Sequence, residues 1–178
     1  MSLGQSLFTF LVFTLLVVFI RNSNRVYSNL DLQFAQNRYR LEALSILNSY
    51  AEEATQYVFD EAVVDTNVSK KLSEFTDPDQ LGFEANDNGK IDDFDDYNNY
   101  TVSDTGQSGI VYKLQFQVDY VKLSGGEFVQ SNTKEYHKRL RIELFDQYDP
   151  PVLFHWANGQ KVKDTLRVTF VYSYWFYN

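Results

Sequence analysis

The uncharged N-terminal run of this chain is the feature that most constrains its fold. The first twenty residues carry no charged side chain, and the segment from Leu7 to Ile20 is apolar except for two threonines. About 20 helical residues cross a bilayer core of roughly 30 Å, so residues 1–20 are long enough to form a transmembrane helix. A secretory signal peptide would begin with basic residues and end in small ones, and this run has neither. We therefore expect a retained membrane helix, with a signal peptide or a buried core helix as the alternatives.

The following segment, residues 21–64, favours a continuation of that helix. No Gly or Pro occurs between Gly4 and Pro78, so nothing in the sequence interrupts a helical backbone. From Leu41 onward, apolar residues recur at spacings of three and four, which is typical of an amphipathic helix. We expect one helix from about Ser6 to about Val63. Its second half would pack on the rest of the domain through Leu41, Leu44, Leu47, Ala51, Ala54, Val58 and Ala62.

Residues 65–108 form an acidic connection. The chain has 178 residues and a formal net charge of −8, and residues 61–109 alone hold 12 acidic and 3 basic side chains. The Asp, Asn, Gly and Pro content predicts ordered loop rather than helix or strand. Calcium prefers oxygen ligands, and this loop gathers several acidic side chains that could supply them. Alternatively, the same side chains cap turns or form a solvated acidic face. The candidate calcium ligands are Asp87, Asp92, Asp93, Asp95 and Asp96.

The C-terminal segment, residues 109–178, predicts an antiparallel β-sheet. Apolar and polar residues alternate from Ile110 to Val121, again in the run from Glu127 to Phe145, and again from Leu166 to Phe176, as in strands with one buried face. Asn158-Gly159 is a favoured two-residue hairpin turn. Such a small sheet needs an apolar partner, and the amphipathic helix is available. The predicted fold class is α+β, a long N-terminal helix packed on a small antiparallel sheet.

Composition argues against an enzyme and against most cofactors. The chain has no cysteine and only two histidines, which removes thiolate chemistry and leaves little for a zinc site. No nucleophile elbow, phosphate loop or zinc spacing occurs. The negative net charge argues against nucleic acid as a partner, although the aromatic C-terminus could stack on bases. We expect no catalytic residues and no cofactor other than the possible calcium. Two N-glycosylation sequons, at Asn67 and Asn99, matter if the domain is exported.

The order of these segments resembles the type IV pilin and pseudopilin superfamily. An apolar N-terminal run after a glycine continues into an amphipathic helix, an acidic loop and a terminal sheet. The segment Gly4–Leu11 (GQSLFTFL) is similar to the start of class III signal segments, and Asp92–Asn98 (DDFDDYN) resembles an acidic stretch of bacterial pilin-like proteins. The family usually has basic residues before the glycine and a glutamate five residues after it, where this chain has Thr9. Counting from Met1 instead places Gln5 at the glutamate position.

The resemblance implies assembly rather than catalysis. The chain would be a structural subunit of an extracellular, type IV pilus-like filament at the cell surface, with a precursor anchored in the inner membrane. Its partners would be copies of itself and the pilus assembly machinery, and Gln5 would hydrogen-bond the N-terminal amine of a neighbour. The exposed edge formed by Leu166–Phe176 is a candidate for tiling, or else an ordinary core strand. The expected assembly residues are Gln5, Leu7, Phe8, Phe10, Leu11, Phe13, Leu15, Leu16 and Phe19.

A second function remains open from the sequence. The chain could be a single-pass, membrane-anchored extracytoplasmic binding domain that never polymerises, because a membrane helix alone accounts for the apolar run. Arg21 and Arg25 follow the run while no charge precedes it, and the positive-inside tendency by itself would keep the C-terminal domain in the cytoplasm. Pilin-like proteins often break this tendency before assembly.

Overall fold

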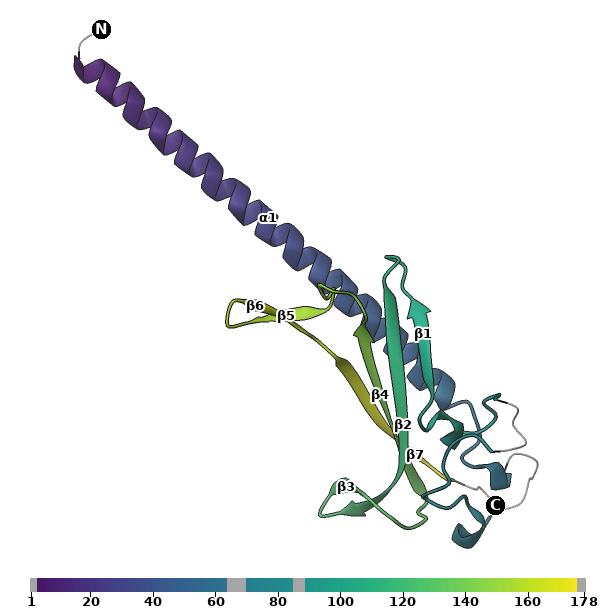
Figure 1. Ribbon diagram of the computed structural model, residues 1–178. Helices are drawn as coiled ribbons and strands as arrows, with labels where there is room; N and C mark the ends of the chain where they lie inside the picture. The colour runs from purple at the N-terminus through teal and green to yellow at the C-terminus, as the bar shows by residue number, and fades with distance from the viewer. Residues whose placement is uncertain (1–2, 64–69, 85–88, 176–178) are drawn as a thin grey trace. The chain divides into compact units, whose positions relative to one another are not determined.

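The computed structural model describes residues 3–63, 70–84 and 89–175. The chain divides into two compact units, Met1–Arg38 and Tyr39–Asn178. The first unit is helical throughout its described part, and the second contains the end of that helix together with the β-strands and loops (Figure 1). The predicted α+β fold class is confirmed.

Helix α1 runs from Leu3 to Ala54, nine residues short of the predicted end at Val63. The helix stops because the following residues gain more from the domain core than from another helical turn. Phe59 and Asp60 are buried, and Val58 bridges to Asp93 in a short parallel pairing. The three residues after Asp60 form only a 3₁₀ turn, η1 (Glu61–Val63). The expectation of helix over Thr55–Val63 was therefore wrong.

The main sheet has the strand order β1-β2-β4-β7, all antiparallel. Its long central strand β2 pairs with β1 on one side and with β3 and β4 on the other. In the described part of the chain, β1 and β7 form the two edges (Figure 1). The bounds are β1 (Thr101–Thr105), β2 (Val111–Ser124), β3 (Glu127–Gln130), β4 (His137–Asp146) and β7 (Leu166–Ser173).

Two details of the sheet differ from the sequence expectation. Thr101–Thr105 lies in the segment predicted to be loop, yet it pairs along its whole length with β2. The run predicted as one strand from Glu127 to Phe145 is interrupted between β3 and β4. At this interruption the Ser131 hydroxyl donates to Glu135 Oε1 at 2.9 Å, while the Ser131 N–H still donates to Tyr120 O at 2.8 Å. Local side-chain hydrogen bonds thus hold a short excursion between two strands.

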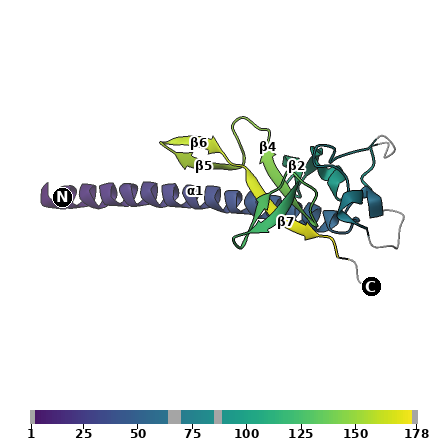
Figure 2. The same ribbon diagram turned by 90° about the horizontal axis from the view of Figure 1, so that it is seen from below.

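A separate two-stranded sheet, β5 (Phe154–Ala157) and β6 (Gln160–Lys163), forms a hairpin apart from the main sheet (Figure 2). The predicted turn at Asn158-Gly159 is confirmed, with φ of 52° and 77° at the two residues. Positive φ at both central positions matches the twist of the flanking strands, and Asn and Gly tolerate it.

The core of the second unit lies between the end of α1 and the inner face of the sheet. The predicted inward face of β2, which includes Leu114 and Phe116, is confirmed as buried. The rings of Tyr50 on α1 and Phe116 meet edge to face, with centroids 5.5 Å apart. The buried strand residues of this core are Tyr112, Leu114, Phe116, Val118 and Tyr120 on β2 and Leu140, Ile142 and Leu144 on β4.

The helix contributes a different apolar face from the predicted one. Leu47 and Ala54 are fully buried as expected, and Ala43 joins them. Leu41 and Leu44, however, are 68% and 38% exposed, so their assignment to the packed face was wrong. Leu41 and Leu44 line an open hollow together with other residues of α1, and two of these, Asn48 and Glu52, also border β7.

The loop between β1 and β2 is tied to the helix by Glu42. Its carboxylate accepts hydrogen bonds from the Ser108 N–H at 2.7 Å, from the Ser108 hydroxyl, and from the Tyr112 hydroxyl at 3.2 Å. A Cβ on Gly106 would lie 2.4 Å from Glu42 Cδ, so the loop approaches this closely only because position 106 has no side chain.

Candidate functional site

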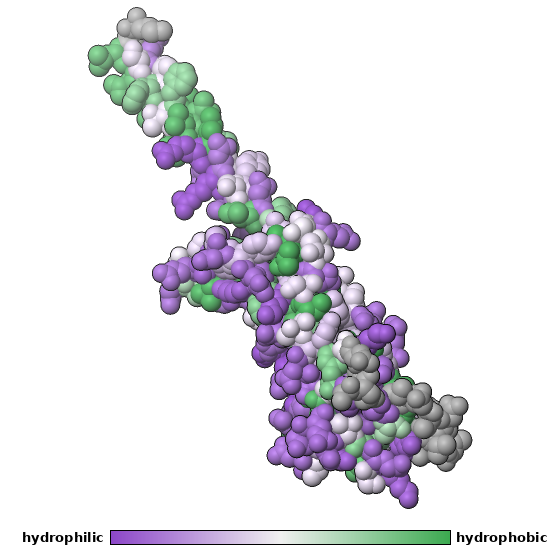
Figure 3. Space-filling view, turned by 45° about the vertical axis from the view of Figure 1, so that its right-hand side comes forward, coloured by the Kyte–Doolittle hydropathy of each residue, from purple (hydrophilic) through white to green (hydrophobic). Residues whose placement is uncertain are grey.

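The expected assembly residues all lie on the exposed part of α1 in the first unit. Their apolar members are 49% to 73% exposed, and no residue of the most apolar window is buried. Figure 3 shows apolar side chains gathered over this segment. By length and composition, α1 is the one helix in the described chain that could cross a membrane. The structure describes all of the expected assembly residues, which are Gln5, Leu7, Phe8, Phe10, Leu11, Phe13, Leu15, Leu16 and Phe19.

The two threonines inside the apolar run hydrogen-bond their hydroxyl groups within the helix. The Thr9 hydroxyl donates to Gln5 O at 2.9 Å, and the Thr14 hydroxyl donates to Phe10 O at 2.8 Å. A hydroxyl that bonds the carbonyl one turn earlier needs no water. The run therefore presents a surface that suits lipid or an apolar protein environment on every side.

The predicted calcium ligands have separate surroundings in the structure. Asp93, Asp95 and Asp96 are buried, Asp92 is exposed, and Asp87 lies outside the described residues. Asp93 Oδ1 accepts the N–H groups of Asp95 at 2.8 Å and Asp96 at 3.1 Å, so this carboxylate caps the 3₁₀ helix η3 (Asp95–Tyr97). The described residues contain no group of three or more acidic, histidine or cysteine side chains placed to share a metal ion. The calcium site stays a prediction.

A buried ion cluster around Lys138 was missed by the sequence reasoning. The Lys138 ammonium donates to Phe59 O at 2.8 Å, to Asp60 Oδ2 at 2.7 Å and to Asp95 Oδ1 at 2.8 Å. The four groups come from three segments that lie far apart in the chain. The sequence held one signal, because Lys138 alternates in phase with Leu140 and the other inward residues of β4. A lysine at an inward-facing position of a strand must either interrupt the strand or pair with buried carboxylates.

The pKa of one carboxyl group beside this cluster, that of Asp93, is raised. The Lys138 ammonium uses its three hydrogens on other oxygens, and Asp93 Oδ2 and Asp95 Oδ2 find no N–H donor among the described residues. Burial, followed by the negative charge of Asp95, raises the pKa of Asp93 to about 9. Burial also raises the pKa of Asp95, against the opposing attraction of Lys138. The raised pKa favours the protonated form of Asp93 at neutral pH.

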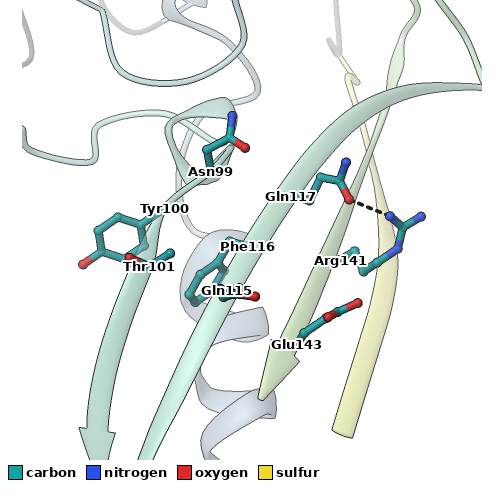
Figure 4. A pocket seen from close by; sticks show the side chains of 8 residues that line it. All are labelled: Asn99, Tyr100, Thr101, Gln115, Phe116, Gln117, Arg141 and Glu143. Carbon is teal, nitrogen blue, oxygen red and sulfur yellow. Dashed lines mark hydrogen bonds between the residues drawn. The ribbon is translucent and has the colours of Figure 1, made fainter. Parts of the chain in front are cut away.

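A polar hollow of about 310 Å³ lies on the outer face of the sheet (Figure 4). The Gln115 and Gln117 side chains of β2 lie between β1 and β4, and the Arg141 guanidinium donates to Gln117 Oε1 at 2.7 Å. Glu143 beside it accepts from Arg167 Nε of β7 at 2.8 Å. The hollow is shallow and carries hydrogen-bonding groups, with Phe116 as the only fully apolar lining residue. Its lining residues are Asn99, Tyr100, Thr101, Gln115, Phe116, Gln117, Arg141 and Glu143.

Of the two sequons, the structure describes only the one at Asn99, and Asn67 lies outside the described residues. Asn99 is exposed at the rim of the polar hollow, with φ of 62°. It lies two residues before the start of β1. Glycosylation at both positions stays a prediction.

In the described part of the aromatic C-terminus, Tyr172 and Tyr174 pack against rings of the core. The Tyr174 ring lies 5.1 Å from the Phe75 ring, and Tyr172 lies 4.9 Å from Phe94. Trp175 is 73% exposed, and Tyr177 lies outside the described residues.

The candidate functional site of this chain is the apolar helix, with the polar hollow as a second surface. No known protein family, curated protein or solved structure matches the chain.

Proposed function

We propose that this protein is a structural subunit of an extracellular, type IV pilus-like filament. The observation that carries the proposal is the segment Leu7–Ile20, which is apolar on all sides and exposed along its whole length. Such a segment needs apolar surroundings, and lipid before assembly and copies of the same helix afterwards both supply them. The antiparallel sheet domain would then cover the outside of the filament.

The free energy of moving the helix from lipid to a bundle of helices is compatible with a reversible membrane anchor. Lipid tails are as apolar as leucine side chains, so moving the helix from the bilayer to a helix bundle changes its hydrophobic free energy little. Packing between the side chains must drive the association. The large rings of Phe8, Phe10, Phe13 and Phe19 offer a surface for that packing. Gln5, at the exposed start of the helix, would hydrogen-bond a neighbour's N-terminal amine.

The first test is electron microscopy of material sheared from cells that make the protein, with mass spectrometry of its N-terminus. We expect filaments that contain the chain, and the mass of the N-terminal peptide identifies the residue at which the mature subunit begins. Recovery of the whole chain in the membrane fraction, with none in sheared material, contradicts the proposal.

A single-pass anchored binding domain is the second candidate, and the polar hollow on the outer sheet face is the observation that favours it. The two functions are separated by replacing Leu7–Ile20 with a scrambled sequence of the same composition. The scrambled segment keeps its length and hydropathy, so membrane anchoring is retained in both cases. A filament subunit loses polymerisation because the packing order of its side chains is lost, whereas an anchored binding domain keeps its function.

A further inference from the structure

The second unit leaves an apolar side of α1 uncovered. Leu41 and Leu44, the two leucines expected in the core, line an open hollow of about 510 Å³ together with Ser45, Asn48, Ser49 and Glu52. These six residues are called the helix groove. Leu47 and Ala43, on another side of the same helix, are fully buried by the sheet. An apolar pattern that continues onto a second side of a helix indicates a second packing partner.

The β5–β6 hairpin carries a face of complementary character. Its register pairs Phe154 with Lys163 and Trp156 with Lys161, so these four side chains share one face. Trp156 is 64% exposed. Lys161 Nζ lies 4.3 Å from the centre of the Phe154 ring and 5.9 Å from that of Trp156. These four residues are called the hairpin face, which is aromatic and positively charged.

The hairpin is held at its base. Arg40 donates to Phe154 O at 3.0 Å and forms an ion pair with Asp164, which also binds His155. Trp156 and Leu41 are 64% and 68% exposed in the structure, so the hairpin face of a chain leaves the helix groove of the same chain uncovered.

We propose that the hairpin face of one copy docks in the helix groove of a second copy. The inference rests on the proposed filament function and names the contact between its subunits. Trp156 would cover Leu41 and Leu44, and a hairpin lysine would pair with Glu52. A buried tryptophan is a frequent energetic centre of protein interfaces. Because the two surfaces differ, each contact leaves a free groove at one end and a free hairpin at the other, so the contact extends into an open chain.

The absence of cysteine from the sequence makes cross-linking a direct test. The full-length chain carrying Ser45→Cys and Lys161→Cys keeps Trp156, Leu41 and Leu44. Mild oxidation in the membranes of cells making the protein, and in sheared filaments, should give a ladder of covalent oligomers. Chains with only one of the two cysteines can give at most dimers. A control chain with Ser45→Cys and Gln117→Cys, whose second cysteine lies on the outer sheet face, should stay monomeric.

Trp156→Ala in the double-cysteine chain should lower the ladder yield at least tenfold, while Leu123→Ala, at another exposed apolar residue, should leave it unchanged. Circular dichroism checks that both variants are folded. Filaments without the ladder overturn the contact and leave the filament function standing. A ladder in membranes without filaments supports the contact and contradicts the filament function. Trp156-dependent binding to anionic phosphatidylserine vesicles without cross-linking assigns the hairpin face to lipid and overturns the proposal.

Discussion

Replacing Asp93 by Asn should make the protein more stable, and increasingly so as the pH rises. Asp93 is fully buried, and its pKa is raised from 3.8 to about 9 by burial and by the charge of Asp95. Between these values the folded chain binds a proton that the unfolded chain has released. The free energy of unfolding therefore falls with rising pH, by about 1.4 kcal/mol per unit from this group. Asn resembles the protonated acid, because its Oδ1 can accept the N–H groups of Asp95 and Asp96 and its Nδ2 can donate to Asp95.

The expected advantage of the Asp93→Asn variant grows by about 4 kcal/mol between pH 5 and pH 8, from three units of that slope. The assay is urea unfolding of the full chain in detergent micelles, followed by near-ultraviolet circular dichroism, which reports on the buried tyrosines. Asp92→Asn is the matched control, because Asp92 is the exposed neighbour and should leave the pH slope unchanged. A constant difference between wild type and Asp93→Asn across this pH range would refute the assignment of the buried proton.

Four further variants test the packing, each by the same urea unfolding at pH 7. Lys138→Met should cost about 3–5 kcal/mol, because Asp60 and Asp95 lose their buried counter-ion; an unchanged midpoint contradicts the ion cluster. Leu47→Ala should cost about 2–5 kcal/mol, whereas Leu41→Ala, at an exposed position, should stay within about 0.5 kcal/mol; equal costs contradict the assignment of the buried face. Glu42→Ala should cost about 1.5–3 kcal/mol, because Ser108 and Tyr112 lose a charged acceptor; no loss means that the loop is held by other contacts.

The sequence was a good guide wherever a single period ran through a segment. The alternation from Tyr112 to Tyr120 placed the inward face of β2 correctly, and Asn158-Gly159 located a turn whose backbone angles only such residues adopt readily. Both signals are local, because neighbouring residues determine which face of a strand or which turn type forms. The apolar run before Ile20 was visible for the same reason.

Features that depend on distant partners were missed. The helix ends at Ala54 because Phe59 and Asp60 find partners far along the chain, among them Lys138, which lies about 80 residues later. Strand β1 is short and polar, and only its pairing with β2 makes it a strand. Leu41 and Leu44 fit the helical period as well as Leu47 does, and the position of the sheet decides which of them is covered. The periodicity shows that a helix carries regularly spaced apolar residues, but it does not show which of them other parts of the fold cover.

The pairing of β7 with β4 has a consequence for how the chain is made. Tyr172 of the last strand and Tyr174, just after it, close the aromatic core over Phe59. The apolar start of α1 leaves the ribosome about 150 residues earlier than β7, which at 5–20 residues per second is roughly 8–30 s. In the proposed function, the apolar segment thus has time to reach lipid surroundings while the domain is still open. We expect folding of the sheet to follow insertion, so that a chain stalled before Leu166 would be anchored and unfolded.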